Sequence, residues 1–193
     1  KDAGIAVKLL DRMQTLALEP NLHDNINYSL FFVDVAHTIN PLAISQTLAE
    51  VAKSKGMIFK QASVSKIVQS SNGVTIKTDK EAFDTDHCVV ACGAWSKELL
   101  KGLNYRLPIE AERGYSYSLP LADDASASLS RPVASAERRF IITPMQSTLR
   151  LAGTVEYAGL HTPPNYKRAE MLEDNAKFIL KSLPSKDTVN DER

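Results

Sequence analysis

Apolar residues recur along the chain at two spacings, one typical of helices and one typical of strands. Four segments have the helical spacing or begin with residues typical of a helix start, and each is followed within two residues by proline or glycine. Proline and glycine end helices because proline lacks an amide hydrogen and glycine tolerates the left-handed backbone. The pattern predicts helices over residues 4–18, 41–55, 95–100 and 166–183.

The second predicted helix has the clearest start, because Asn40 can cap the free amide groups and Pro41 suits the first turn. Its buried stripe is predicted to be Leu42, Ile44, Leu48, Val51 and Ala52. The first helix has apolar residues at Ile5, Leu9, Met13 and Leu16, and the last should point Met171, Leu172, Ile179 and Leu180 inward. Each of these helices should therefore pack one face on another layer.

The remaining apolar segments are short and have the character of strands. They cover residues 28–33, 57–61, 64–69, 74–78, 83–92, 113–119, 131–136, 138–143 and 148–155. Turn residues at 70–73 and 144–147 predict two hairpins. This order predicts an α+β fold, with one large mixed, mostly antiparallel sheet and helices packed on a face.

Composition excludes several functions. The 23 basic and 23 acidic residues cancel and are mixed along the chain, which argues against a nucleic-acid-binding surface. No apolar run approaches the roughly 20 residues that cross a bilayer. The histidines are scattered without the spacing of metal ligands, so no metal site is predicted.

The two cysteines, Cys88 and Cys92, lie on one predicted strand. Their separation there is about 13 Å at ~3.3 Å per residue, whereas a disulfide requires Cα atoms within ~7 Å. We therefore expect two buried, reduced thiols, which suit a cytoplasmic location.

Glycine placement limits what the chain can bind by itself. No two of its eight glycines lie two residues apart, so a GxGxxG nucleotide fingerprint is impossible. The chain also begins at Lys1 without an initiator methionine. We expect a trimmed central piece of a longer enzyme, in which residues 185–193 are a polar tail or a severed connection. Residues 123–130 are small and polar, and are expected to form an exposed loop rather than a flap over a site.

Six short motifs then occur in a consistent order. They are Leu18-Glu19-Pro20-Asn21-Leu22, the Asn40-Pro41 helix start, Ala62-Ser63-Val64-Ser65-Lys66-Ile67, Val89-Val90-Ala91-Cys92-Gly93-Ala94-Trp95-Ser96, Arg113-Gly114-Tyr115 and Arg150-Leu151-Ala152-Gly153-Thr154-Val155-Glu156. Together they resemble the D-amino-acid oxidase and dehydrogenase family of FAD-dependent oxidoreductases. The resemblance implies that residues 1–184 form the substrate domain, with residues 60–100 nearest the FAD.

The resemblance also implies which residues contact the cofactor, FAD. These are Val64, Ala91, Cys92, Gly93 and Trp95. Val64 would contact the adenine through its backbone, and Gly93 would let the backbone pass close to the ADP half. Trp95 would pack beside the adenosine, although a core tryptophan is an equally good interpretation.

The candidates for the substrate pocket are Arg113, Tyr115, Phe140, Thr154 and Glu156. Four of them have a simpler interpretation: Arg113 as a surface ion pair, Phe140 as a core aromatic, and Thr154 and Glu156 as residues that pair across the sheet. No residue is assigned as an acid or base catalyst, because the reaction implied is hydride transfer from the α-carbon of a D-amino acid to the flavin. The resulting imine would hydrolyse to a keto acid and ammonia.

Three functions remain open from sequence. The first is oxidation of the C–N bond of a small amino acid, with Arg113-Gly114-Tyr115-Ser116 leaning toward a dehydrogenase, and with no activity expected for this chain alone. A dehydrogenase that feeds a respiratory chain would have to contact the membrane. The second keeps the flavin but changes the substrate to sarcosine, glycine, another secondary amine or glycerol 3-phosphate. The third is a non-catalytic binding or assembly module.

A cut domain should expose an apolar patch toward its missing FAD-binding half, or self-associate through that patch.

Overall fold

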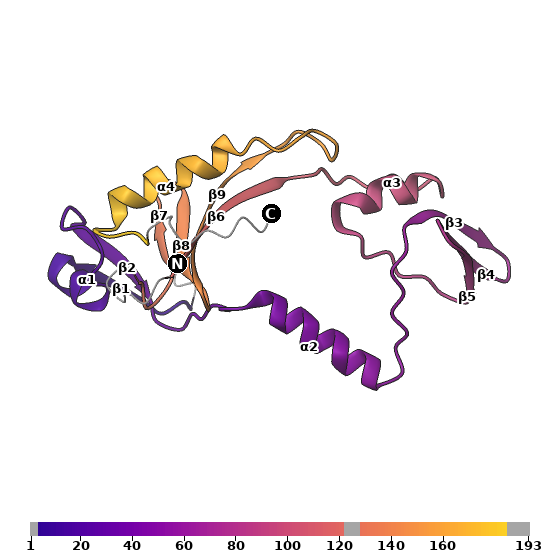
Figure 1. The fold of residues 1–193 in the computed structure, drawn as a ribbon, viewed down its shortest axis with the longest axis horizontal. Coiled ribbons are helices and arrows are strands. Elements are labelled where there is room, and N and C mark those ends of the chain that lie inside the picture. Colours follow the sequence, from indigo (N-terminus) through magenta and orange to yellow (C-terminus); the bar gives the residue numbers. More distant parts are fainter. Residues whose placement is uncertain (1–3, 122–127, 185–193) are drawn as a thin grey trace. The chain divides into compact units, whose positions relative to one another are not determined.

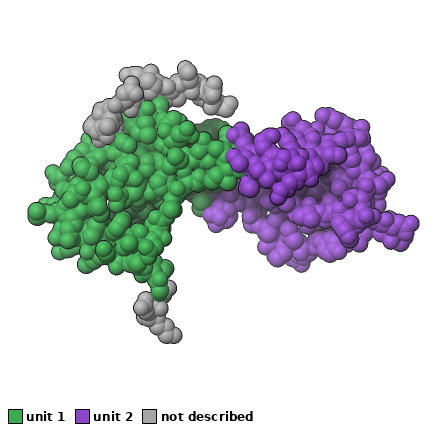
Figure 2. Space-filling view, turned by 90° about the horizontal axis from the view of Figure 1, so that it is seen from below, with its two compact units in different colours: residues 1–45, 114–155, 164–193 green, residues 46–113, 156–163 purple. Residues whose placement is uncertain are grey.

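The computed structural model describes residues 4–121 and 128–184. The predicted tail at 185–193 and most of the predicted loop at 123–130 lie outside these ranges. The chain divides into two compact units, coloured separately in Figure 2. Unit 1 comprises residues 1–45, 114–155 and 164–193, and unit 2 comprises residues 46–113 and 156–163.

Unit 1 is built on a four-stranded sheet with the order β6-β9-β8-β7. The strands are β6 (Arg113–Pro120), β7 (Val133–Ser135), β8 (Phe140–Pro144) and β9 (Thr148–Glu156), and helix α4 (Lys167–Ile179) lies along one face (Figure 1). Between sheet and helix lies the apolar core, which includes Leu119, Ile142, Leu149, Leu151, Leu172, Ala176 and Leu180. Truncating one of these leucines to alanine costs roughly 2–5 kcal/mol in proteins generally.

The predicted hairpin at 144–147 is confirmed. The Met145 amide donates to the Thr148 carbonyl at 2.8 Å, and β8 and β9 pair in antiparallel register on either side. The cap predicted for the second helix is also confirmed, because the Asn40 side chain accepts from the Ala43 amide at 2.9 Å. Asn40 additionally donates to Gln146 Oε1 at 2.7 Å, which ties the start of this helix to the hairpin.

The predicted helix over residues 4–18 is wrong in its first half. Residues Val7–Asp11 form strand β1, which pairs antiparallel with β2 (Tyr28–Phe32), and only Arg12–Leu18 form helix α1. The helix begins here because Asp11 accepts from the Gln14 amide while the Gln14 side chain accepts from the Asp11 amide. This capping box satisfies two terminal donors and fixes the start of the helix.

Unit 2 contains an antiparallel sheet with the order β3-β4-β5. Its strands are β3 (Val64–Ser70), β4 (Gly73–Thr78) and β5 (Ala82–Thr85), followed by a 3₁₀ turn (Gly93–Trp95) and helix α3 (Ser96–Lys101). The predicted turn at 70–73 is confirmed. Gly73 is required there, because its φ is +138° and an added Cβ would lie 2.6 Å from the Thr85 carbonyl oxygen.

The α+β class, antiparallel pairing and helix packing on a sheet face are confirmed, but the strands form three sheets rather than one. Residues 57–61 form no strand, and the strand predicted over 83–92 ends at Thr85, where its pairing with β4 stops. Without strand pairing, Cys88 is only half-buried and Cys92 is exposed, so the prediction of two buried thiols is wrong.

The predicted stripes on two helices also need correction. Helix α2 (Pro41–Ser54) forms as expected, but none of its residues is buried, so the predicted buried stripe is wrong. In α4, Leu172 is buried as predicted while Met171 is exposed, and the small residues Ala169 and Ala176 provide the remaining buried positions. Among the described residues, no helix is both long and apolar enough to cross a bilayer, and no group of side chains could hold a metal ion.

Candidate functional site

The five cofactor candidates all lie in unit 2. Val64 is the first residue of β3, an edge strand of its sheet, so one side of the strand's backbone is left unpaired by the sheet. Ala91, Cys92 and Gly93 are exposed in the segment before α3. Gly93 has a φ of +54°, and an added Cβ there would meet open space. This glycine is therefore suited to its backbone conformation rather than to a close contact within the chain.

Trp95 is 62% exposed, which excludes the core interpretation within this unit. The 3₁₀ turn holds it in place through the Trp95 amide, which donates to the Cys92 carbonyl at 3.1 Å. Nearby in sequence, Val89 is 90% exposed. An adenine base needs a flat apolar contact and hydrogen bonds at its edge, and unit 2 contains groups of both kinds in its exposed apolar side chains and the unpaired backbone of an edge strand.

Two of the substrate-pocket candidates, Arg113 and Glu156, form an ion pair in unit 2. The Arg113 Nη1 lies 3.5 Å from the Glu156 carboxylate, with the two side chains 27% and 17% exposed. Arg113 also donates to the Thr162 carbonyl at 2.7 Å. Arg113 therefore has the ion pair that its simpler interpretation expected, with Glu156 as the partner, and the pair is partly buried rather than fully solvated. Beside it in sequence, hydrogen bonding to Glu112 raises the pKa of Tyr157 above its ordinary value.

The other three substrate-pocket candidates lie in unit 1 and have different environments. Phe140 is 5% exposed within the apolar core, which supports its packing interpretation rather than a place in a pocket. Gly153 faces it across the sheet, and an added Cβ there would lie 2.7 Å from the Phe140 Cβ. Tyr115 is also buried, and its hydroxyl accepts from the Asn165 amide at 2.8 Å, just before α4.

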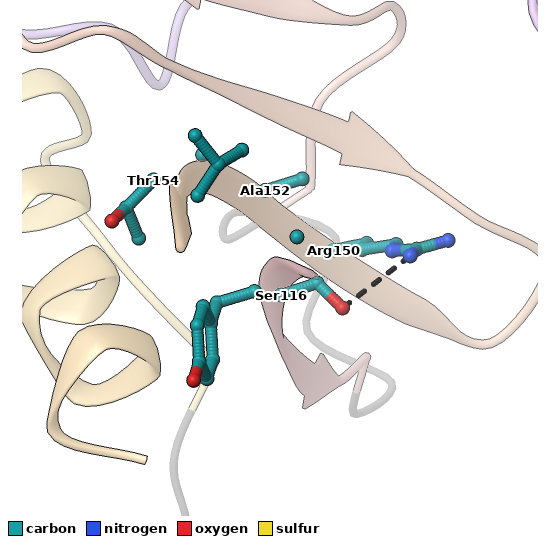
Figure 3. A pocket seen from close by; sticks show the side chains of 8 residues that line it. Ser116, Arg150, Ala152 and Thr154 are labelled. Atoms are coloured by element: carbon teal, nitrogen blue, oxygen red, sulfur yellow. Dashed lines mark hydrogen bonds between the residues drawn. The ribbon is translucent and has the colours of Figure 1, made fainter. Parts of the chain in front are cut away.

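Tyr115 and Thr154 line a pocket of about 260 Å³ formed by β6 and β9 (Figure 3). Its other lining residues are Gly114, Ser116, Arg150, Ala152, Gly153 and Val155. Arg150 Nη2 donates to the Ser116 hydroxyl at 3.3 Å across the pocket. Sequence reasoning missed Arg150 and Ser116. The alternation of side chains along a strand could have indicated Arg150, because this residue lies between two core leucines and must therefore point to the opposite face of the sheet.

Thr154 has a φ of +55°, which is rare and strained for a β-branched residue. Arg168 of α4 holds it there, donating from Nη1 to Thr154 Oγ1 at 3.1 Å and to the Val155 carbonyl at 3.3 Å. The Nε of Arg168 is buried and finds no hydrogen-bond partner in the described part of the chain. Sequence reasoning missed Arg168 too. Its position could have indicated a role, because a cation in the first turn of a helix is unfavourable next to the positive end of the helix dipole.

Comparison with solved structures shows which proteins share this fold. The fold is similar to glycine oxidase from Geobacillus kaustophilus, with a TM-score of 0.79 and 20% identity, covering 92% of this chain and 47% of that one. It is also similar to L-proline dehydrogenase from P. horikoshii, with a TM-score of 0.75 and 16% identity, covering 92% of this chain and 49% of that one. The chain therefore shares the fold of the corresponding half of these two enzymes.

Residues 1–192 match the family described as FAD dependent oxidoreductase (DAO), and the chain belongs to this family. It is 30% identical to D-amino-acid oxidase of Bradyrhizobium diazoefficiens, over 95% of this chain and 43% of that protein. It is 26% identical to glycine oxidase of Pseudomonas putida, over 85% of this chain and 44% of that protein. The chain thus spans less than half the length of these relatives. The predicted resemblance is confirmed, and FAD is confirmed as the family's cofactor.

Proposed function

We propose that this chain is the substrate domain, with part of the FAD-contacting surface, of an oxidoreductase that oxidises the C–N bond of a small amino acid. Residues 1–184 form that domain, and residues 60–100 lie nearest the cofactor. A D-amino acid is the preferred substrate, because the chain is 30% identical to a D-amino-acid oxidase and 26% identical to a glycine oxidase. Glycine or a secondary amine is the second candidate, supported by similarity to glycine oxidases in sequence and fold.

The exposed surface of unit 2 carries this proposal. Val64, Val89 and Trp95 all present apolar side chains to solvent, and the segment from residue 86 to residue 92 has no regular secondary structure. A partner that covers such a surface gains roughly 25 cal/mol per Å² of apolar area removed from water. In the proposed enzyme, that partner is FAD together with the other half of the protein.

The roles of individual residues follow from their positions. When bound, FAD would accept the hydride released from the substrate's α-carbon. Val64 would offer backbone groups to the adenine edge, Gly93 would pass close to the ADP half, and Trp95 would pack on the adenosine. On the substrate side, Tyr115 and Thr154 would shape the pocket wall. Arg113 and Glu156 would hold the ends of β6 and β9 together, since they pair with each other.

Unit 1 has an exposed apolar face of its own, which supports a partner domain or self-association. Strands β1 and β2 align Val7 with Phe32 and Leu9 with Leu30, and all four side chains are exposed. Contiguous apolar surface of this kind marks interaction sites in proteins. We infer that the FAD-binding half covers apolar surface of this chain, and that the chain alone does not turn over substrate.

The deciding experiment compares the purified chain with a longer protein that contains it and an FAD-binding half. We expect the longer protein to be yellow and to bleach when D-amino acids are added without oxygen, and the chain alone to be colourless and inert. Bleaching by glycine or sarcosine but not by D-amino acids would favour the second substrate candidate. A longer protein that binds no flavin would overturn the proposal and favour an assembly module.

A variant pair tests the cofactor surface. Trp95→Ala in the longer protein should weaken FAD binding by about tenfold, since stacking on an aromatic ring contributes roughly 1–3 kcal/mol. Tyr105→Ala is the matched control, because Tyr105 is a similarly exposed aromatic residue in the same unit. FAD dissociation is measured by recovery of flavin fluorescence. Equal weakening of FAD binding in both variants would show that Trp95 does not contact the cofactor specifically.

A further inference from the structure

Asn72 is followed by Gly73 in the turn that joins β3 to β4, and no other asparagine of the chain precedes a glycine. Asn72 is exposed, and Ser70 and Gly73 on either side of the turn form the last pair of the hairpin. A backbone nitrogen that follows asparagine can attack the side-chain amide, and glycine hinders this attack least because it has no Cβ. The turn therefore combines a reactive pair of residues with access from solvent.

A neighbouring hydroxyl group activates the Asn72 amide. Ser71 Oγ donates to Asn72 Oδ1 at 3.2 Å, which withdraws electron density from the carbon that would be attacked. The same hydrogen bond would stabilise the negative charge that develops on this oxygen during the attack. Asn72 and Gly73 also line a cavity of about 300 Å³, so water can reach the same carbon.

We propose that Asn72 is a site of spontaneous deamidation and isomerisation in the folded chain, with Ser71 as the group that polarises the amide. The Gly73 nitrogen forms a bond to Asn72 Cγ, and the side-chain nitrogen leaves as ammonia with the Gly73 amide proton. The five-membered imide that results is then opened by water at either of its carbonyl groups. Opening gives aspartate or isoaspartate, and no oxidant, reductant or enzyme is required.

The product changes both the charge and the backbone at this end of unit 2. The cavity beside Asn72 is also lined by Asp84 and Asp86, so a third carboxylate adds like charge to two others. Isoaspartate additionally places a methylene group in the backbone, and the register of a hairpin depends on its turn. We therefore expect amide hydrogen exchange in β3 and β4 to be faster in the converted chain.

The test is incubation of the folded chain at mildly alkaline pH, followed by mass spectrometry of its peptides and by enzymatic methylation of isoaspartate. Asn72 should convert first, with release of ammonia. Asn104 is the internal control, because it is also exposed and lies in the same unit, but Tyr105 follows it and the Cβ of tyrosine hinders the attack. Asn104 should therefore remain an amide while half of Asn72 reacts.

Ser71→Ala should slow the conversion of Asn72 roughly 2- to 10-fold, because it removes one neutral hydrogen bond to the reacting amide. Ser71→Thr keeps a hydroxyl at this position and should retain most of the rate. Asn72→Gln should abolish the early release of ammonia, since attack on glutamine would form a less favourable six-membered ring, whereas Asn104→Gln should leave it unchanged. Gly73→Ala is unsuitable as a test, because its Cβ would lie 2.6 Å from the Thr85 carbonyl oxygen.

Equal conversion of Asn72 and Asn104 would overturn the proposal. Conversion of Asn72 in urea but not in the folded chain would also overturn it, because the turn would then protect the residue. A rate unchanged by Ser71→Ala would exclude Ser71 as the polarising group. The comparison of the two asparagines uses the unaltered chain, so it decides the main point even if a variant does not fold. No flavin or substrate is needed, so the outcome is independent of the proposed function.

Discussion

The Glu19 carboxylate lies 2.9 Å from Arg131 Nε, although the two residues are 112 positions apart in sequence. The Glu19 side chain is only 5% exposed, and the amide and hydroxyl of Ser130 also donate to it. A buried carboxylate with this many donors is fully compensated. These contacts hold the segment just before β7 (Val133–Ser135) against the end of helix α1, so Glu19 of the Glu-Pro motif has a structural role in this chain.

Replacing Glu19 with alanine should lower the free energy of unfolding by about 2–3 kcal/mol, because hydrogen bonds to a buried charged group are lost and their donors are left unpaired. Glu19→Gln should cost less, since one acceptor oxygen remains. Far-UV circular dichroism in urea measures the effect. The single tryptophan, Trp95, lies in unit 2 and its fluorescence would not report on unit 1 directly.

The control for this prediction is Glu81→Ala. Glu81 pairs with Lys60 at 2.8 Å, but both side chains are half exposed, so the change should cost less than about 1 kcal/mol. Equal losses in the Glu19 and Glu81 variants would show that burial of the Glu19 carboxylate contributes nothing.

Two glycines that line the same pocket should respond oppositely to alanine. At Gly153 the new Cβ would lie 2.9 Å from the Arg139 carbonyl oxygen and 3.0 Å from the Phe140 Cα, so backbone must move. Gly153→Ala should therefore cost about 1–3 kcal/mol. At Gly114 the new Cβ meets nothing within 4 Å, so Gly114→Ala should be neutral or stabilising by up to about 1 kcal/mol. Urea unfolding compares them, and a neutral Gly153→Ala would contradict the close approach.

Elements joined by local turns were predictable from the sequence. The hairpin of β3 and β4 and that of β8 and β9 each combine turn residues with strands that are neighbours in sequence, and both were predicted correctly. The first segment failed because Ile5, Leu9 and Met13 fit a helical period equally well, while β2, which pairs with β1, begins at Tyr28. The spacing of apolar residues within one segment contains no information about a pairing strand that lies so far away in the sequence.

For the candidate site, the sequence motifs predicted local turns but not the contacts between separate elements. Gly93 and Trp95 lie in the turn that was predicted from the Gly-Ala-Trp motif, but the apolar run that ends at Cys92 was predicted to be a buried strand and is not one. An exposed run of apolar residues has the same sequence pattern as a buried one. Arg168 and Arg150 were missed because their contacts, with Thr154 and Ser116, depend on the packing of separate elements.

The pKa of Tyr157 gives a prediction for pH dependence. Its hydrogen bond to Glu112 favours the neutral phenol and raises the pKa above the ordinary value of 10.0. Since the folded-state pKa is the higher one, the stabilisation is present below the unfolded pKa and is lost as pH rises through the folded value. Glu112→Gln should return the pKa toward 10.0, as measured from the ¹³Cζ shift of Tyr157. No change in that variant would exclude Glu112 as the cause.

Arg168 and Thr154 provide the last prediction, because one residue stabilises a strained backbone at the other. Thr154→Asn should raise the free energy of unfolding by about 1 kcal/mol, since asparagine tolerates a positive φ and retains an oxygen acceptor. Thr154→Val keeps the β-branched strain and removes the acceptor, so it should cost about 1–2 kcal/mol. Urea unfolding followed by circular dichroism measures both changes.

A double-mutant cycle separates the contact between Arg168 and Thr154 from the general effects of each substitution. Arg168→Met should be destabilising, because it also releases the Val155 carbonyl at the end of unit 1's last strand. If Arg168 acts through Thr154, then Arg168→Met and Thr154→Val combined should cost less than their separate losses added, by about 0.5 kcal/mol or more. Strict additivity would mean that Thr154 holds its left-handed backbone without help from Arg168, and the strain would then have to be maintained by the pairing of β9 with its neighbouring strands.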